Sequence, residues 1–446
     1  MPTTFDFWDR ATSPLWRDLY ALEARSADQE VPVRAARTLV PPGQRHGWRV
    51  RVSAQGGLAL RRVKDVDPDP SSSYGRQLLR ATVYADALRA PRSDAVVLES
   101  FGGAGTDGDP GALARALLAH DPDREVVWSV ADAAIPAPAG CRAVVQGTAA
   151  WFDAVGRAGT LVTNGTFPRW FAKAEDQVLV QTWRGTALRR LGPDVNDPRV
   201  LDEDDELLEE QSRQWDLLVT PNAFTSAVLT KALGYPGPVA EIGSPRNDRL
   251  LADPDGALRT AVRRRLGVPD GRRVVLYAPT WRENARARGH HEKVLVADPA
   301  DLAARLGDTV VLVRGHPNTA ASASVSGPGV VDVTTYPDLA ELFLAADVLV
   351  SDHSAVLFDF VLTDKPVVLL APDLEEYQSG DRGLYVDLLA DPPGPVVSTL
   401  EQLVPALEAG DAHAEDRHRM RETYGELEDG GATRRLLELL FPAARD

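Results

Sequence analysis

Short apolar runs rich in β-branched residues alternate with Ala-, Leu- and Arg-rich helical segments from about residue 95 onward. This alternation is typical of strand-helix-strand units that build parallel sheets. The strands predicted in the first series are residues 95–100, 125–130, 160–164, 177–183 and 216–220. Those predicted in the second series are residues 273–279, 309–315, 347–352 and 366–372. The pattern therefore predicts two parallel sheets, one after the other.

A Gly- and Pro-rich segment separates the two series at about residues 234–245. Two consecutive sheets of this kind imply an α/β protein with two Rossmann-like domains that face each other across a cleft. Ligands then bind at the carboxyl ends of the strands. We predict a small, β-rich N-terminal extension of unassigned role, two such domains, and a helical tail that packs back on the first domain. The boundaries are 1–90, 91–238, 239–410 and 411–446.

Composition narrows the class of protein. A chain of 446 residues with 44% apolar and 26% charged residues is expected to fold into more than one globular domain. It contains no apolar stretch of ~18 residues and no secretory signal pattern, which favours the cytoplasm. Its single cysteine, Cys141, excludes an internal disulfide and a multi-cysteine metal site. The net charge of -16 argues against nucleic-acid binding.

Polar side chains gather where the strands of the second series end. They are Thr280, Arg282, Arg314, His316, Ser351, Asp352, His353 and Ser354. Hydroxyl, arginine and histidine donors at neighbouring strand ends suit a phosphate, and Ser354 opens a helix whose free N–H groups point at an anion. For Ser354 the alternative is an ordinary helix cap. His316 is placed to hold a pyrophosphate oxygen or to pass a proton to the leaving phosphate.

The first series offers two further segments. The loop at 99–105 contains Ser100, Gly102 and Gly103 and is similar to a phosphate-cradling glycine loop, although it has neither G-x-G-x-x-G nor a Walker lysine. Residues 183–192 bring Trp183, Arg184 and Thr186 to the cleft. An aromatic ring beside arginines can clamp a sugar or polyol phosphate, and a buried tryptophan at the domain seam is an equally simple account.

Several segments in this order together resemble one known family. They read VLESFGGAGTDGDPGALARALL, TNGTFPRWFAKAEDQVLVQTWRGTALRRLG, EIGSPRNDRLL, VLYAPTWRE, RGHPN and ADVLVSDHSAVLFDFVLTDKPVVLLAPDLEEY, followed by DRGLYVD and PGPVV. The chain resembles the CDP-glycerol glycerophosphotransferase family, the teichoic acid primases and polymerases, from about residue 96 to 400. The resemblance implies a GT-B-like fold and an enzyme that moves glycerol phosphate or ribitol phosphate from a CDP-activated donor to an acceptor hydroxyl.

The resemblance also implies where each substrate binds. The donor is expected against Thr280, Arg282, Arg314, His316, Ser351, Asp352, Ser354, Asp359 and Arg382, with Asp359 either facing the pocket or packing beneath it. The acceptor, a lipid-linked molecule or a glycan, is expected against Ser100, Gly102, Gly103, Asn164, Trp183 and Thr186. The hydroxyl attacks the distal phosphorus and CMP leaves, and no cofactor is expected. No compact Asp/His motif of the D-x-D kind follows a strand in the cleft, which favours a mechanism without a metal and leaves metal dependence open. Family members work at the inner face of the cell membrane, so peripheral attachment there is expected.

Two positions depart from the family pattern. The family typically has WHGT where this chain has WRGT, and arginine cannot act as the general base expected from that histidine. Either another group takes the proton, or Arg184 binds a phosphorylated or otherwise different acceptor, or the enzyme is slow or inactive. At His353 the family usually has tyrosine, so this histidine is a candidate for the missing base. We therefore name His316, Arg184 and His353 as catalytic candidates.

Two other functions fit the same architecture. One is a nucleotide-sugar glycosyltransferase or epimerase, which predicts use of a UDP-sugar without CMP release. The other is a catalytically impaired family member that binds a nucleotide or polymer as a scaffold. The sequence leaves open which polyol is used, whether one unit or many are added, and the oligomeric state.

Overall fold

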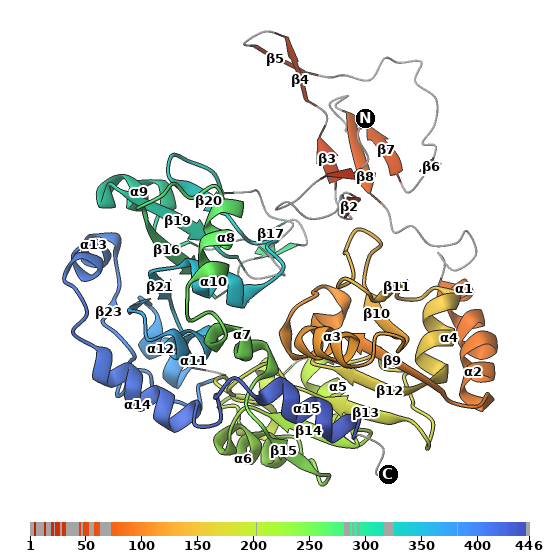
Figure 1. Cartoon of the computed structure of the whole chain (residues 1–446). Helices are drawn as coiled ribbons and strands as arrows, with labels where there is room; N and C mark the ends of the chain where they lie inside the picture. Colours follow the sequence, from red (N-terminus) through yellow and green to blue (C-terminus); the bar gives the residue numbers. More distant parts are fainter. Residues whose placement is uncertain are drawn as a thin grey trace.

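The structure is a computed structural model that describes residues 73–442, apart from 202, 281–285, 288–289, 292–294, 316–324 and 381 (Figure 1). Of residues 281–294, only the backbone of β17 (Arg286–Ala287) and β18 (His290–His291) is described. Before residue 73 it describes the backbone of short antiparallel strands. These are β1 (Thr4–Phe5), β2 (Ser13–Pro14), β3 (Leu19–Ala21), β4 (Glu23–Ser26), β5 (Gln29–Pro32), β6 (Gln44–Arg45), β7 (Trp48–Val52) and β8 (Leu58–Arg62).

The first domain contains a parallel sheet in the order β11-β10-β9-β12-β13-β14-β15. Its strands are β9 (Ser93–Glu99), β10 (Val126–Val130), β11 (Arg142–Val145), β12 (Ala158–Thr163), β13 (Val178–Gln181), β14 (Leu217–Thr220) and β15 (Val239–Glu241). The chain builds outward from β9 in one direction and then returns to β12 on the other side. The switch point of the sheet therefore lies between β9 and β12, where ligand crevices form in open α/β sheets.

Helices cover both faces of this sheet. They are α1 (Ser73–Leu79), the π-helical turn η1 (Arg80–Tyr84), α2 (Ala85–Arg89), α3 (Gly108–His120), α4 (Ala149–Arg157), α5 (Glu203–Ser212), α6 (Ala223–Ala232) and α15 (Ala432–Leu440). Val97 packs toward α4 with Trp151, whereas its neighbour Val96 packs toward α3 with Leu113. Successive residues of a strand point to opposite faces, so a strand buried on both sides is apolar throughout.

The second domain repeats the design with the parallel order β20-β19-β16-β21-β22-β23. Its strands are β16 (Arg273–Ala278), β19 (Thr309–Val313), β20 (Val330–Asp332), β21 (Val348–Ser351), β22 (Val367–Leu370) and β23 (Val396–Val397). The switch point of this sheet lies between β16 and β21. Its helices are α7 (Asp248–Leu251), α8 (Ala257–Arg265), α9 (Pro299–Leu306), α10 (Leu339–Ala345), α11 (Val356–Phe360), α12 (Leu374–Ser379), α13 (Leu400–Glu408) and α14 (Ala414–Tyr424).

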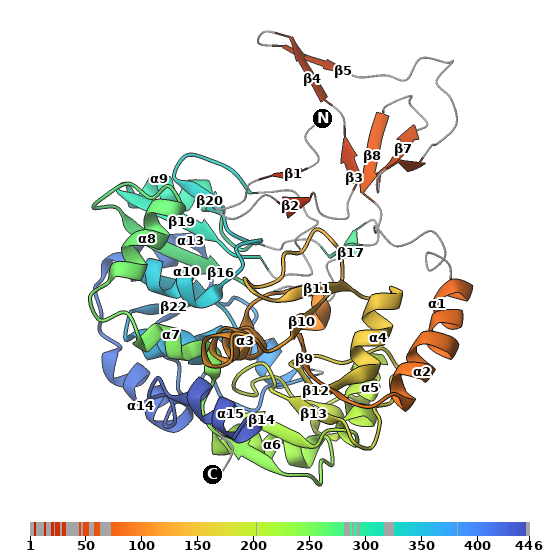
Figure 2. The same cartoon turned by 45° about the vertical axis from the view of Figure 1, so that its right-hand side comes forward.

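Two backbone features help to tie the two domains together. Residues 188–190 of the first domain run antiparallel to 383–385 of the second, with Arg190 N donating to Gly383 O at 3.1 Å and Tyr385 N to Leu188 O at 2.8 Å. After α14, the chain crosses back and α15 lies against α3 (Figures 1 and 2). Leu436 of α15 is fully buried in the apolar cluster of the first domain.

The nine strands predicted from the sequence all occur, and four other described strands of the two parallel sheets were missed. The missed strands are β11, β15, β20 and β23, and each lies at the edge of its sheet. An edge strand is short and half-exposed, so its sequence carries no continuous apolar run. The predicted boundary at residue 90 also differs from the packing, because α2 contacts α4 and Tyr84 belongs to the first-domain core.

No described helix has the length and apolar character needed to cross a bilayer.

Candidate active site

The donor-side residues meet at the switch point of the second sheet. Thr280 follows β16 and Asp352 follows β21, and these strands are neighbours. The Asp352 carboxylate accepts hydrogen bonds from Thr280 N at 3.0 Å and Thr280 Oγ1 at 2.6 Å. Ser351 Oγ donates to Ala278 O at 2.6 Å, which ties the same two strand ends together. The structure thus brings together three of the residues predicted to surround the donor.

His353 and Ser354 follow in the loop before α11. The His353 ring is buried and stacks on Tyr377 of α12, with the centroids 3.4 Å apart and the planes at 12°. Its Nε2 lies 3.6 Å from Asp373 Oδ1. Ser354 Oγ is 3.5 Å from Val356 N, at the long end of a helix-capping hydrogen bond. The imidazole is therefore held by side chains of the second domain, and its role as a base stays a prediction.

Asp359, one turn further along α11, is engaged with the segment that links the domains. Its carboxylate accepts from Arg246 Nη2 at 2.8 and 2.9 Å and from Asn247 Nδ2 at 2.8 Å. Both partners lie in the turn η5 (Pro245–Asn247), directly after β15. Asp359 thus ties the linker to α11, the helix that follows residues 352–355, which are called the donor loop below.

Two of the three arginines predicted to bind the donor, Arg314 and Arg382, contact protein groups. Arg314 Nη1 donates to Val333 O at 3.0 Å and also to Tyr336 O. Burial lowers its pKa, while the Asp107 carboxylate across the domain interface opposes that shift. The Arg382 guanidinium pairs with Asp205 of α5 at 2.9 and 3.1 Å. Arg314 thus bonds backbone carbonyls within the second domain, and Arg382 links the second domain to the first. Contact of either side chain with a donor stays a prediction.

The acceptor-side residues meet at the switch point of the first sheet. Ser100 follows β9 and Asn164 follows β12, and Asn164 Nδ2 donates to Ser100 Oγ at 3.1 Å. Asn164 Oδ1 accepts from Phe101 N at 2.7 Å. Gly103 has a φ of +81°, and a Cβ there would lie 2.6 Å from Ala131 N. Glycine is therefore required where this loop crosses β10.

The segment after β13 presents Arg184. Trp183 has a φ of +55° and is buried, and its N–H donates to Gln181 Oε1 at 3.0 Å. The exposed Arg184 guanidinium lies over the Trp183 ring, 5.4 Å from its centroid. Thr186 Oγ1 accepts from Asn222 Nδ2 at 3.0 Å and is buried. The strained tryptophan thus sets the direction of Arg184, which reaches the surface. Packing around its guanidinium lowers the pKa of Arg184, and the nearby Asp204 carboxylate opposes that shift.

Arg282 and His316, two central candidates of the sequence analysis, lie outside the described residues. Arg282 follows β16, which borders the donor-side switch point, and His316 follows β19, the neighbour of β16. Their roles stay predictions.

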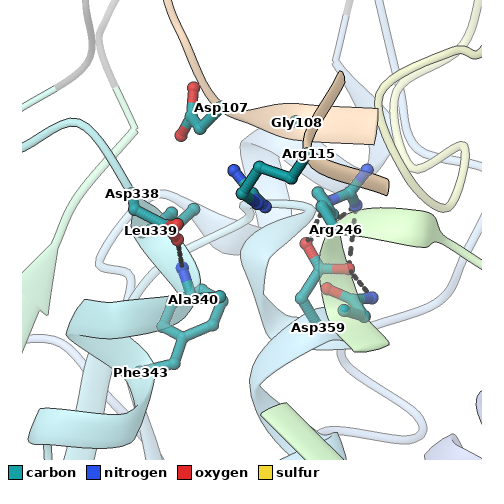
Figure 3. A pocket seen from close by; sticks show the side chains of 10 residues that line it. Asp107, Gly108, Arg115, Arg246, Asp338, Leu339, Ala340, Phe343 and Asp359 are labelled. Carbon is teal, nitrogen blue, oxygen red and sulfur yellow. Dashed lines mark hydrogen bonds and ion pairs between the residues drawn. The ribbon is translucent and has the colours of Figure 1, made fainter. Parts of the chain in front are cut away.

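The sequence reasoning assigned no role to Arg246, because GSPRND reads as a linker after β15. In the structure Arg246 lines a small cavity between the domains together with Asp107, Asn247, Asp338 and Asp359 (Figure 3). The cavity has a volume of about 20 Å³, which is enough for about one water molecule and far too little for a nucleotide. Burial raises the pKa of Asp109, a second carboxyl partner of Arg246, to about 6. The cavity is thus part of the interdomain contact.

Among the described residues, no group of three or more histidine, cysteine or acidic side chains is placed to hold a metal ion.

Comparisons with known proteins agree on one family. The profile of the CDP-Glycerol:Poly(glycerophosphate) glycerophosphotransferase family matches residues 82–442. The teichoic acid glycerol-phosphate transferase of Staphylococcus aureus is 30% identical over 383 residues, which cover 82% of this chain and 98% of that protein. The teichoic acid poly(glycerol phosphate) polymerase of Bacillus subtilis is also 30% identical, over 73% of this chain and 45% of the relative.

Solved structures give the same answer. The wall teichoic acid polymerase TagF superposes with a TM-score of 0.72 at 27% identity, covering 82% of this chain and 92% of the TagF chain. A TagF variant soaked with CDPG superposes with a TM-score of 0.71. The chain belongs to the CDP-glycerol:poly(glycerophosphate) glycerophosphotransferase family.

Proposed function

We propose that this enzyme transfers glycerol phosphate from CDP-glycerol to a hydroxyl group of a teichoic acid acceptor. Glycerol is favoured over ribitol by the share of this chain that each kind of relative matches. The glycerol-phosphate transferase is matched over 82% of this chain, whereas a ribitol-phosphate polymerase is matched over 46% at 27% identity. The broader activity, transfer of a CDP-activated polyol phosphate in teichoic acid synthesis, is that of the family.

In this reaction the acceptor hydroxyl oxygen attacks the glycerol-bearing phosphorus of the donor. A new P–O bond forms, the bond from that phosphorus to the bridging oxygen breaks, and CMP leaves with the bonding electron pair. The hydroxyl proton passes to a base. Catalysis of this kind depends on positioning the two substrates and on stabilising charge on the phosphoryl oxygens. The switch-point cluster of Thr280, Ser351 and Asp352 supports a donor site at the second sheet.

The acceptor side is supported by Arg184. An exposed guanidinium over an aromatic ring is preorganised to form charge-assisted hydrogen bonds with phosphate. We infer that the acceptor carries a phosphate group that Arg184 binds, and that the acceptor is presented at the inner face of the cell membrane. Two arginines of α8 are already paired within the protein, Arg263 with Asp347 at 2.7 Å and Arg265 with Glu341 at 2.8 Å, whereas Arg264 is exposed.

The test is calorimetric binding of CDP-glycerol, CDP-ribitol, CMP and a UDP-sugar, each to the wild-type chain and to His316→Ala. We expect cytidine-selective binding with CDP-glycerol preferred, and weaker donor binding in the variant. Preference for CDP-ribitol would change the proposed polyol from glycerol to ribitol and leave the proposed reaction unchanged. Preference for the UDP-sugar would instead support a glycosyltransferase, and cytidine binding without CMP release in the presence of a glycerol phosphate oligomer would support a scaffold role.

A further inference from the structure

Arg246 contacts segments that come from both domains. It lies in η5, its side chain is only 17% exposed, and its backbone N donates to Asp109 Oδ1 of α3 at 3.0 Å. Its guanidinium faces Asp359 of α11, as Figure 3 shows. One side chain in the linker therefore joins a first-domain helix to the helix that follows the donor loop.

The pair with Asp359 fixes the orientation of the guanidinium. Nη2 reaches both carboxylate oxygens, at 2.8 and 2.9 Å, and Nε lies 3.3 Å from Oδ2. Contacts from two nitrogens of a planar group define its angle as well as its distance, which an ammonium group cannot reproduce. Asn247 Nδ2 holds the same carboxylate at 2.8 Å, so the acceptor of this pair is itself fixed.

The other side of the guanidinium lies against the acceptor loop. Gly185 has a φ of +97°, and a methyl group there would clash with Nη2 of Arg246. The same Nη2 donates to Asp359, so the nitrogen that faces Gly185 is the one held by the ion pair. Gly185 directly follows Arg184, so the backbone that carries Arg184 rests on Arg246. The acceptor loop, defined here as residues 183–186, and α11 thus both lie against the guanidinium of Arg246.

We propose that Arg246 is a positioning residue for transfer, which sets the acceptor loop at a fixed distance from the donor-side helix α11. This inference rests on the proposed function, because it concerns the approach of acceptor to donor. Arg246 acts through the loop and through Asp359. Its charge is already matched by two carboxylates, Asp359 at 2.8 Å and Asp109 at 3.6 Å, so it is not a spare cation for a substrate phosphate.

The experiment compares Arg246→Lys with the wild type in three assays that use CDP-glycerol. These are transfer to a glycerol phosphate oligomer, hydrolysis of the donor by water, and donor affinity by calorimetry. Misplacement of about 1 Å can cost on the order of 10²-fold in rate. We expect transfer to fall by about that factor, while donor affinity and hydrolysis stay within about threefold, because water needs no acceptor loop.

A matched control is Arg263→Lys. Arg263 is 18% exposed and pairs with Asp347 at 2.7 Å, but it lies in α8 within the second domain. We expect this variant to transfer within about threefold of the wild type. The double variant Arg246→Lys/Asp359→Asn should be no more than about threefold slower than Asp359→Asn alone, because the two residues act as one unit.

Three results would overturn the inference. One is an Arg246→Lys variant that transfers as fast as the wild type. Another is a parallel loss of transfer, hydrolysis and donor affinity, which would place Arg246 in the donor site or in the stability of the fold. In both cases a wild type that binds and turns over CDP-glycerol leaves the proposed function intact. A wild type that neither binds nor uses CDP-glycerol would overturn both.

Discussion

Arg184 is the residue that we propose to bind the phosphate group of the acceptor. It replaces the histidine that the family resemblance leads one to expect, and arginine remains protonated at any working pH. Arg184 lies over the Trp183 ring. Gln181 accepts a hydrogen bond from the backbone N–H of Trp183, and Asn222 donates one to the Thr186 hydroxyl. The arrangement favours binding of an anion over abstraction of a proton.

We expect Arg184→Ala to raise the KM for a glycerol phosphate oligomer by at least about tenfold, since a hydrogen bond to a charged group contributes about 1.5–3 kcal/mol. The affinity for CDP-glycerol should not change. Steady-state kinetics at saturating donor gives the KM. An unchanged KM with a much lower kcat would contradict this role.

A wild-type rate that rises with pH through about 6.5 and loses this dependence in His353→Ala would assign the base to His353.

Glu428 is a second residue with a testable consequence. Its Oε1 accepts from Ser244 N at 3.0 Å and Asn247 Nδ2 at 3.3 Å. Burial, and then the nearby Asp359 carboxylate, raise the pKa of Glu428 from 4.5 to about 7, while Arg246 opposes the shift. The folded chain therefore binds this proton more tightly than the unfolded chain does, so the stabilisation is complete below pH 4.5 and is lost as the pH rises to about 7.

We expect Glu428→Gln, which keeps the accepting oxygen but cannot ionise, to become more stable relative to the wild type as the pH rises. The difference should grow by about 3 kcal/mol between pH 4.5 and pH 8, following the free-energy value of a pKa shift. Urea unfolding of both proteins across this range measures it. A difference that is constant with pH would show that Glu428 ionises normally in the folded chain.

At the residue scale, the sequence predicted those side-chain contacts that follow from the order of the strands in the sheet. Thr280 and Asp352 end neighbouring strands, so their meeting follows from recognising β16 and β21. Arg246 could not be found in this way. Its importance comes from Gly185 and Asp359, which are distant in sequence, and nothing in the local pattern of GSPRND records those contacts.

At the scale of elements, α15 is the clearest case of a segment that stabilises a distant part of the chain. Leu436 of this helix is fully buried among residues of the first sheet and α3, whereas Leu439 is 49% exposed. A leucine removed from a packed core costs about 2–5 kcal/mol, and an exposed one is usually within about 0.5 kcal/mol of neutral.

We therefore expect Leu436→Ala to lower the free energy of unfolding of the first domain by about 2–5 kcal/mol. Leu439→Ala, on the same helix, is the control and should have little effect. Thermal unfolding, with tryptophan fluorescence as the probe, compares the two. Equal and small effects would mean that α15 contributes little to the first domain.

The elements also show where sequence patterns stop being informative. Central strands such as β9 and β16 are buried on both faces and read as unbroken apolar runs. The residues of the edge strand β20 are all only partly buried, and those of the edge strand β15 are partly buried or exposed. The two-domain α/β fold with GT-B-like organisation was predicted from the central strands and the resemblance, and it is confirmed by the superposition with TagF.

At the scale of the whole molecule, the domains are joined by a buried ion pair. Arg382 of the second domain and Asp205 of the first are 14% and 10% exposed and lie 2.9 Å apart. Removing one partner of a buried pair leaves an uncompensated charge, which costs about 3–5 kcal/mol. A surface pair at the end of α5, Arg213 with Glu209, is more than half exposed on both sides and is expected to contribute little to stability.

We expect Asp205→Ala to lower the free energy of unfolding by about 3 kcal/mol and to increase protease cleavage at the domain junction. Glu209→Ala should do neither. If Asp205→Ala instead left stability unchanged and tightened CDP-glycerol binding, Arg382 would be a donor ligand that Asp205 merely restrains.

The return of α15 to the first domain also bears on how the protein is made. The ribosome releases β9 long before Leu436, yet both belong to one apolar cluster. During synthesis the first domain therefore presents an unfilled apolar surface next to α3 until the last helix emerges. Domains usually fold in the order in which they are translated. Here the domain that begins first is expected to be completed last, and a nascent chain stalled before residue 432 should bind chaperones through that surface.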